Sequence, residues 1–537
     1  MKLLKTLTAG LLTVAMTGMA SAATTLHLTG STAFRASATV AIINQLGGTS
    51  CRCIYYNSSP VGGGVFQMFA NGTVGVGGSA TTIVLTQWTG SLAGVVDLVS
   101  QNTALNFINP TDATVVSDMN SSAALCTAVT TNSSPQGYTG GKLESSTPAL
   151  TPSAPDAAFT DAFQTSVAAS VATCGTIASP GININGTLVT NGSVLAQKVN
   201  AATLVEAGSS TPGAGTATGT VGIIPFEWVL GNYAGYTGSN APFSNITQQT
   251  ALSLIQLGSV PIAFFNPALS ANTTDFAYLI GRSEDSGTRI VDFAEPQNGF
   301  GNGCNQFELS FSANQKTTGA LPQPTTGLQT GGTGSTVQTI DYWPSNAPVN
   351  TLPKINWNTT GHGGYVSGGD VGNVLASTDP LLVNTSNTVN DGSSVYIPNA
   401  PFENTPTSQG GTGGASPKAY VVGYIGIADA GGTVTTIHNG TLLTYNGVAY
   451  SPAAVTSGAY SLWGFEHFYY ISSGFDAIGT AQKAIADTLA DSISSTYAPS
   501  DKTGNVNSST GDGAGIIYSA TAGVTRSAEG APITINY

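Results

Sequence analysis

The sequence has few charged residues. Only 8% of its 537 residues are Asp, Glu, Lys or Arg, while 41% are hydrophobic; ordinary soluble domains carry about 25% charge. A chain this apolar is not kept disordered by charge repulsion. The 14 basic residues are outnumbered by 27 acidic ones, which excludes a broad basic surface for nucleic acid or anionic membranes. An anion would therefore have to be bound by local dipoles and a few well-placed cations.

Long apolar runs are also missing, since no stretch reaches the roughly 20 residues that cross a bilayer. The N-terminal segment combines Lys2 and Lys5 with a short apolar run and the ending Ala20-Ser21-Ala22. This pattern is typical of a cleavable secretory signal peptide. We expect residues 1–22 to be removed and the mature chain to be periplasmic or secreted, without a lipid anchor because no cysteine follows the cleavage site. Removal of the two lysines leaves a net charge of about -15.

Cysteine and histidine are scarce. The five cysteines are Cys51, Cys53, Cys126, Cys174 and Cys304. Disulfides can form outside the cytoplasm, but an odd number of cysteines with these spacings does not determine the pairing. The four histidines are isolated and form no H-x-x-x-H pair. We therefore expect neither a metal site nor a cofactor.

Glycine and proline, in contrast, are abundant, with 67 and 26 residues, which excludes a long helical or coiled-coil architecture. A strand, a glycine turn and a helix follow one another at Thr25–Leu28 and Ala33–Leu46, and again at Phe276–Ile280 and Thr288–Glu295. This order predicts an α/β fold. Apolar residues at helical spacing predict another helix over Phe475–Asp491. The length favours two or more domains.

Other stretches are distinguished by a biased amino-acid composition. The aromatic segment Trp463–Tyr470 is interpreted as a core strand in preference to a sugar-stacking surface. Segments rich in Gly, Ser, Thr and Pro are predicted to be surface loops or irregular β insertions. They cover residues 62–82, 132–155, 208–220, 317–336 and 405–417.

Three predicted helix starts combine glycine with hydroxyl side chains: Gly30-Ser31-Thr32, Gly90-Ser91 and Ser286-Gly287-Thr288. Unpaired amides and the positive end of the helix dipole can bind anions there, although for any one site taken alone ordinary capping is the favoured explanation of the hydroxyls. The third start is preceded by Arg282, whose guanidinium can hold an oxyanion through two parallel hydrogen bonds. The sequence therefore predicts an oxyanion site at this turn.

The segment Arg282–Thr288, R-S-E-D-S-G-T, resembles the R-x-D-x-S-G-T loop of the PstS-type phosphate-binding proteins of ABC transporters. It departs from that loop in having Glu284 for aspartate and Asp285 where glycine is common, and Arg35 stands where the family often has proline. Further segments resemble the family in the same order along the chain. They are Leu28–Phe34, Gly90–Gly94, Asp156–Asp161, Asn245–Gly258, Val422–Gly426 and Ala449–Tyr470.

The resemblance implies an α/β, two-lobed type II periplasmic-binding-protein clamp, with mixed sheets flanked by helices and long Gly/Ser/Thr-rich insertions. Lobe I would comprise residues 23–215 with 452–537, and lobe II residues 216–451. Inorganic phosphate, or a related oxyanion, would bind between the lobes of a monomer that is not an enzyme and would pass to an ABC transporter permease. The implied ligand-binding residues are Thr32, Phe34, Ser91 and Asp161 from lobe I, and Arg282, Ser286, Gly287 and Thr288 from lobe II.

Alternatives stay open at this point. The chain could be a secreted surface or matrix protein that uses the clamp as a scaffold for its insertions. A phosphate-ester hydrolase would need a nucleophile beside a base, and the sequence indicates no such pair. Asp161, which the resemblance places beside the ligand, could instead cap a helix over Ala162–Val171.

Overall fold

The computed structural model describes the chain in segments. They are residues 23–56, 66–128, 138–144, 146–172, 182–184, 187–189, 192–208, 220–231, 241–270, 276–282, 286–299, 306–310, 339–343, 368, 371–372, 375, 419–427, 440–493 and 523–535. The expected signal peptide, residues 1–22, lies outside them, as do Cys174 and Cys304. No helix within these segments is long and apolar enough to cross a bilayer.

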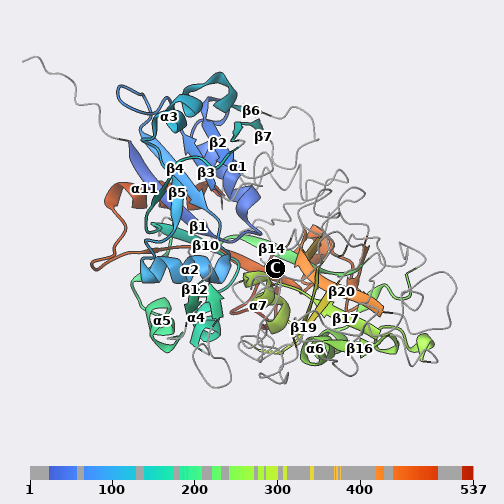
Figure 1. Cartoon of the computed structure of the whole chain (residues 1–537). Helices are drawn as coiled ribbons and strands as arrows, with labels where there is room; N and C mark the ends of the chain where they lie inside the picture. The colour runs from blue at the N-terminus through green and yellow to red at the C-terminus, as the bar shows by residue number, and fades with distance from the viewer. Residues whose placement is uncertain are drawn as a thin grey trace, which may run out of the picture.

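A mixed sheet of 13 strands runs through the molecule (Figure 1). Its strands lie in the order β16 (Ser259–Pro261), β17 (Phe276–Ile280), β20 (Ala419–Gly426), β14 (Thr220–Leu230), β23 (Trp463–Ile471), β10 (Ala157–Thr160), β1 (Thr24–Gly30), β4 (Thr82–Gln87), β3 (Phe66–Ala70), β2 (Arg52–Tyr56) and β8 (Lys142–Glu144), while β13 (Leu204–Glu206) pairs with β23 and β21 (Thr441–Leu442) with β14. Pairs β1–β10, β1–β4, β17–β20 and β2–β8 are parallel, and the other pairs are antiparallel. The mixed α/β fold expected from the sequence is confirmed.

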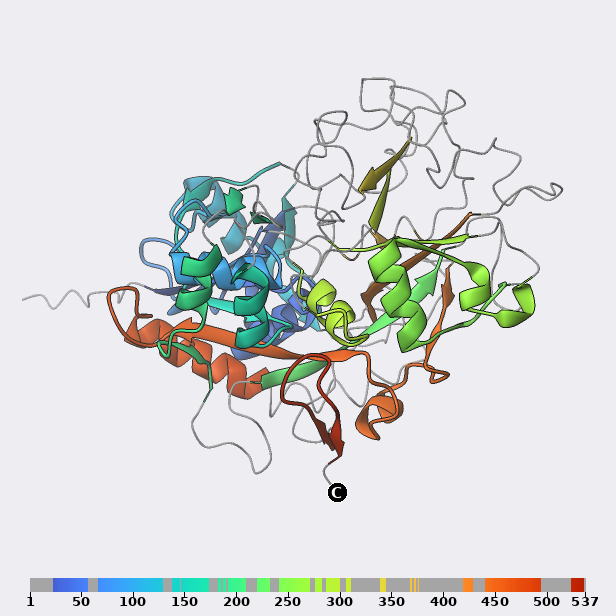
Figure 2. The same ribbon diagram turned by 90° about the horizontal axis from the view of Figure 1, so that it is seen from below.

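Strand β14 joins the two halves of this sheet, one running from β23 to β8 and the other from β20 to β16. Its first part, Thr220–Pro225, pairs with β23, and its second part, Phe226–Leu230, pairs with β20. Pro225 lies where the partner changes, a place where a residue without an N–H costs the ladder little. The two mixed sheets expected from the sequence are therefore hydrogen-bonded into one. Figure 2 shows β23 and β14 passing beneath the middle of the molecule.

Helices cover both faces of the β10–β1–β4 part of the sheet. Ala158 faces a cluster built by α2, α4 and α5, whereas Ala157 and Phe159 face a cluster that includes α1 and α11. In the other half α6 contacts β16 and β17, and α7 contacts β20. The helix bounds are α1 Arg35–Gln45, α2 Ser91–Ser100, α3 Ala113–Asn120, α4 Gln164–Ala172, α5 Gly192–Val199, α6 Gln248–Leu257, α7 Gly287–Ala294, α10 Pro452–Thr456 and α11 Thr480–Asp491.

Short ladders complete the fold. They pair β5 (Asn106–Ile108) with β9 (Leu150–Pro152), β6 (Cys126–Ala128) with β7 (Tyr138–Gly140), β11 (Ile182–Ile184) with β12 (Thr187–Val189), β15 (Asn245–Ile246) with β22 (Thr444–Tyr445), β18 (Gln306–Ser310) with β19 (Thr339–Trp343), and β24 (Val524–Thr525) with β25 (Thr534–Ile535).

Two local predictions were wrong. Helix α11 begins at Thr480 rather than Phe475, because the Ile478 N–H donates to Ile471 O at 2.9 Å and so holds the preceding turn against β23. Residues 62–82, predicted to be a surface loop or an irregular β insertion, instead contain β3, a regular strand of the main sheet whose Gln67–Ala70 are buried between β2 and β4. The predicted insertions at 317–336 and 405–417 lie outside the described residues.

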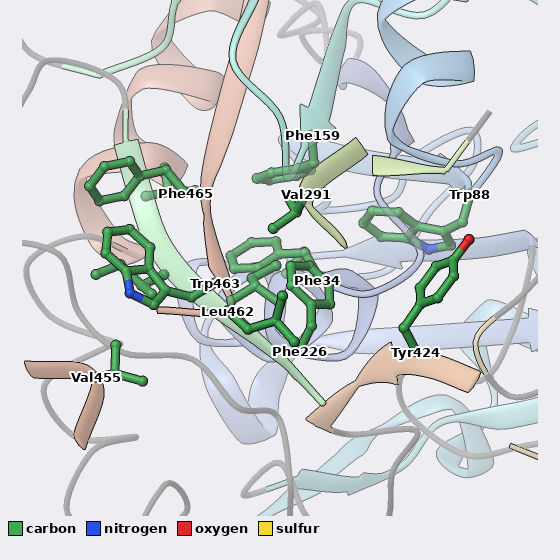
Figure 3. Close-up of a cluster of buried hydrophobic side chains, with 14 of the residues drawn as sticks. Phe34, Trp88, Phe159, Phe226, Val291, Tyr424, Val455, Leu462, Trp463 and Phe465 are labelled. Carbon is green, nitrogen blue, oxygen red and sulfur yellow. The ribbon is translucent and has the colours of Figure 1, made fainter. Parts of the chain in front are cut away.

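The core continues from one half of the molecule to the other (Figure 3). The Phe34 ring lies 5.2 Å from that of Phe159, which stacks on Phe468 of β23 at 4.0 Å. Phe226 of β14 and Val291 of α7 both pack around Gly464. The predicted core strand Trp463–Tyr470 is confirmed, since every residue of β23 is buried.

Two glycines allow a close approach at the end of β1. Gly30 has φ +117°, and a Cβ there would overlap the Phe159 carbonyl oxygen. A Cβ on Gly94, in the first turn of α2, would overlap Gly30 itself. The backbones of β1, β10 and α2 therefore touch where a side chain would separate them.

We predict that Gly30→Ala lowers the free energy of unfolding by about 3 kcal/mol or more, because it combines backbone strain with a clash against main chain. Gly447→Ala is the matched control, since Gly447 has φ +82° and open space around it; strain alone should cost about 1–2 kcal/mol there. Urea denaturation measures both. Equal losses in the two variants would contradict the assigned close approach.

Candidate functional site

Three neighbouring parallel strands end at one edge of the sheet. The Gly90 N–H donates to Gly30 O, and the Ser31 N–H donates to Phe159 O, both at 2.9 Å. These bonds tie the ends of β1, β4 and β10 together. Thr32, Ser91 and Asp161, which follow the three strands, consequently lie at the same edge.

A second group of predicted residues follows β17. Arg282 lies just beyond this strand, Ser286 is the N-cap residue of α7, and Gly287 and Thr288 are the first two residues of the helix. All four are buried. Ser283, Glu284 and Asp285, between them, lie outside the described residues.

The structure brings the two groups into contact. The Arg282 guanidinium donates to the Thr32 hydroxyl and to the Thr288 hydroxyl, each at 3.4 Å. Gly287 lies against Asp161 and Ser91, because a Cβ on Gly287 would overlap the Asp161 carboxylate and lie 2.7 Å from Ser91 Cβ. Helix α7 also contacts α4, and Figure 2 shows it between the two halves.

Hydrogen bonds to its own backbone fix the position of Arg282. Its N–H donates to the Tyr424 hydroxyl at 3.2 Å, and that hydroxyl donates to Gln306 Oε1 at 2.9 Å. Gln306 Nε2 in turn donates to Arg282 O at 3.1 Å, and Arg289 donates to the same carbonyl at 3.4 Å. Gly281 permits this arrangement, since a Cβ there would overlap both Tyr424 and Gln306.

Asp161 is completely buried, and neither carboxylate oxygen has a hydrogen-bond partner among the described residues. Burial raises the pKa of Asp161, while the Arg282 charge acts in the opposite direction. Asp161 does not cap α4. The Phe163 N–H donates to Glu529 at 2.5 Å, and the Gln164 N–H donates to the Tyr469 hydroxyl at 3.3 Å. The capping alternative for Asp161 is therefore wrong.

Two other predicted residues differ in their surroundings. The Ser286 hydroxyl is buried, makes no capping bond, and has no partner in the described part of the chain. Phe34 is buried in the core, and its N–H donates to Ser31 Oγ at 3.2 Å. An anion could use the Phe34 amide only by replacing that hydroxyl.

Two buried carboxyl groups near the site were missed by sequence reasoning. Both oxygens of Asp292 in α7 and of Glu466 in β23 lack partners within the described segments. Burial raises the pKa of each, and the Asp161 charge raises both further. A signal was present in each case, because the acidic residue stood between apolar neighbours, Val291 and Phe293 for Asp292, and beside Phe465 in the aromatic strand for Glu466. Among the described residues no three His, Cys, Asp or Glu side chains are grouped to hold a metal ion.

The C-terminal segment, residues 523–535, contacts the end of α7 and the start of α4. Arg526 donates to Glu295, at the end of α7, at 3.2 Å, and its guanidinium lies 3.8 Å from the centre of the Trp463 ring. Glu529 accepts from the Phe163 N–H and from the Ser166 hydroxyl at the start of α4. The sequence contained no signal for these contacts.

No protein-family model matches the chain, and no curated protein matches it. Solved structures that resemble it include a putative phosphate ABC transporter substrate-binding protein with bound phosphate from Clostridium perfringens (TM-score 0.34, 9% identity, 89% of this chain and 98% of that one). Others are an ABC-type phosphate transport receptor from Vibrio cholerae (0.32, 11%, 92% and 99%) and a possible phosphate-binding protein from Planctomyces limnophilus (0.29, 9%, 88% and 99%). At these TM-scores and identities, the function has to be argued from the site itself.

Buried carboxyl groups should make the free energy of unfolding depend on pH. Glu227 in β14, outside the site, is also buried, and burial raises its pKa to about 8. A folded-state pKa above the unfolded value stabilises the fold at low pH, and that contribution is lost as the pH rises through the folded pKa. We expect the free energy of unfolding to fall between about pH 5 and pH 9. Glu227→Gln should flatten this decrease by a few kcal/mol, measured by urea denaturation, whereas parallel curves would contradict the assignment.

Proposed function

We propose that this protein binds inorganic phosphate between the ends of β1, β4 and β10 and the N-terminus of α7, outside the cytoplasm, and passes it to an ABC transporter permease. One observation carries the proposal: the Arg282 guanidinium is within 3.4 Å of hydroxyls from both groups, Thr32 and Thr288. A buried cation between hydroxyl donors and a helix N-terminus matches the requirements of a tetrahedral oxyanion.

Each predicted residue then has a part in binding. The hydroxyls of Thr32, Ser91 and Thr288 donate to phosphate oxygens, as does that of Ser286, which has no partner among the described residues. The amide of Gly287 lies at the positive end of α7 and adds a backbone donor. The Phe34 amide would join these donors by exchanging its bond to Ser31.

The three buried carboxyl groups affect the net charge of the proposed binding site. Asp161, Asp292 and Glu466 would repel a divalent anion if all were ionised. Because burial raises the pKa of Asp292 and of Glu466 well above that of an exposed acid, these two groups keep their protons more readily, while the Arg282 charge acts on Asp161 in the opposite direction. The site is consequently less negative than its composition indicates.

We assign residues 23–215 and 452–537 to lobe I and residues 216–451 to lobe II, with β14 and β23 as the connection. An ion that contacts residues of both lobes binds best when the lobes are together, so phosphate would favour the closed arrangement. The contact of Gly287 with Asp161 and Ser91 fits such a closed arrangement.

Phosphate titration by calorimetry tests the function, and Arg282 is the decisive residue. We expect saturable binding by the parent chain. Arg282→Lys, which keeps the charge but loses the planar guanidinium, should weaken binding at least tenfold, or about 1.4 kcal/mol, and Arg282→Ala should weaken it further. Absence of binding by the parent would leave the scaffold alternative, and turnover of a phosphate ester would indicate the hydrolase.

Arg52→Lys is the matched control for these variants. Arg52 donates to Met119 O at 3.0 Å and to Ser121 O at 2.9 Å, in β2 near the far edge of the sheet. Its replacement should leave phosphate affinity unchanged. Equal affinities of the parent, Arg282→Lys and Arg282→Ala would mean that this turn does not bind the ligand.

Asp161 is expected to select phosphate over sulfate. Near neutral pH hydrogen phosphate carries a proton that an ionised Asp161 can accept in a hydrogen bond, whereas sulfate has none. Sites built to bond a ligand hydroxyl can reject an analogue without it by roughly 10⁴ to 10⁵. Asp161→Asn should weaken phosphate binding and reduce the phosphate-to-sulfate preference at least tenfold, about 1.4 kcal/mol.

The pH supplies an internal control for this prediction. Because burial raises the pKa of Asp161, the carboxyl group gains a proton on acidification and can then donate to sulfate. The preference of the parent should therefore decrease as the pH falls, while that of Asp161→Asn should change much less. A variant with the parent's preference at every pH would assign Asp161 to structure alone.

A further inference from the structure

Three thiols meet in the core at a distance from the proposed phosphate site. Cys51 and Cys53 flank Arg52 at the start of β2, and Cys126 begins β6. All three are buried in one hydrophobic cluster and are present as free thiols. Segments far apart in the sequence thus place three oxidisable groups together.

The backbone pairing determines which thiols face each other. Arg52 and Leu125 form an antiparallel bridge, and the Cys126 N–H donates to Cys51 O at 2.9 Å. Cys51 and Cys126 consequently occupy opposite positions on the two segments, with their side chains on the same face. Opposite residues in antiparallel pairs have Cα atoms about 4.5–5.5 Å apart. Disulfides require about 4.4–6.8 Å.

The same register disfavours the other two pairings. Cys53 lies opposite Ala124, so Cys126 is its diagonal neighbour. Diagonal neighbours have Cα atoms about 7–8 Å apart, which is too far for a disulfide. Cys51, whose backbone is extended, lies two residues before Cys53 at the start of β2, so their Cβ atoms are about 6–7 Å apart. A disulfide needs Cβ atoms about 3.5–4.5 Å apart.

We propose that Cys51 and Cys126 form a disulfide in the exported protein and that Cys53 stays reduced beside it. The two S–H bonds break and one S–S bond forms. The two protons and two electrons go to an oxidant of the disulfide class, such as oxidised glutathione or a thiol oxidoreductase, which is reduced to two thiols. An extracytoplasmic compartment supplies such oxidants.

The surroundings indicate when the bond forms. A hydrogen bond with Cys126 and burial raise the pKa of the Cys51 thiol, and burial raises that of Cys53. Because the thiolate is the reactive form, thiols in the folded core exchange slowly. Oxidation should therefore accompany folding, and the finished bond should resist reductants until the protein unfolds.

Peptide mapping of the parent chain decides the pairing. The full chain is refolded in a glutathione redox buffer, denatured without reductant, alkylated and digested. Mass spectrometry should find the Cys51 and Cys126 segments joined, lighter by two hydrogen atoms than the separate peptides, with Cys53 alkylated. Alkylation of Cys51 and Cys126, or a different partner for either, would overturn the proposal.

Thermal unfolding provides a second readout. Cys51→Ser, Cys126→Ser and the double variant should share one decrease in melting temperature, on the order of 3–5 °C, because each removes the same bond. Cys53→Ser is the matched control and should retain the cross-link. Additive losses in the double variant would contradict a single shared bond. Phosphate affinity does not enter this test, so its outcome is independent of the proposed function.

Discussion

Burial of the Arg282 guanidinium is the constraint on which the site depends. Removing a guanidinium from water is costly unless hydrogen-bond acceptors or opposite charges surround it. Here acceptors come from two directions, Thr32 after β1 and Thr288 in α7. The turn that carries Arg282 is fixed by Tyr424 and Gln306. One residue thereby links the ends of strands that lie far apart in the sheet.

Three buried acids lie at or near the site. The Asp161 charge acts on both Asp292 and Glu466, and each of the three has a raised pKa because burial penalises its charged form. A chain with so few charges does not attract an anion through a general field. Binding would rest instead on desolvated contacts of short range, which salt screens weakly.

The continuous sheet sets how the two halves can move. Strand β14 pairs with β23 over one part and with β20 over the other, so neither half can turn without bending this strand. The C-terminal segment adds a connection, since Arg526 contacts the end of α7 and Glu529 the start of α4. Rotation of the halves would have to break or carry along these bonds, and this limits the amplitude of any opening.

The sequence by itself determined the α/β class, the strand Phe276–Ile280 and the helix after it, and the buried aromatic strand β23, because hydrophobic periodicity and glycine turns are local signals. It also singled out Arg282 and the hydroxyls at helix starts. Tertiary structure alone decided that Thr32 and Thr288 share one guanidinium, that Glu529 rather than Asp161 satisfies the start of α4, and that Cys126 faces Cys51. Those contacts join segments far apart in the chain, and their register depends on how whole strands and helices pack, which no local pattern encodes.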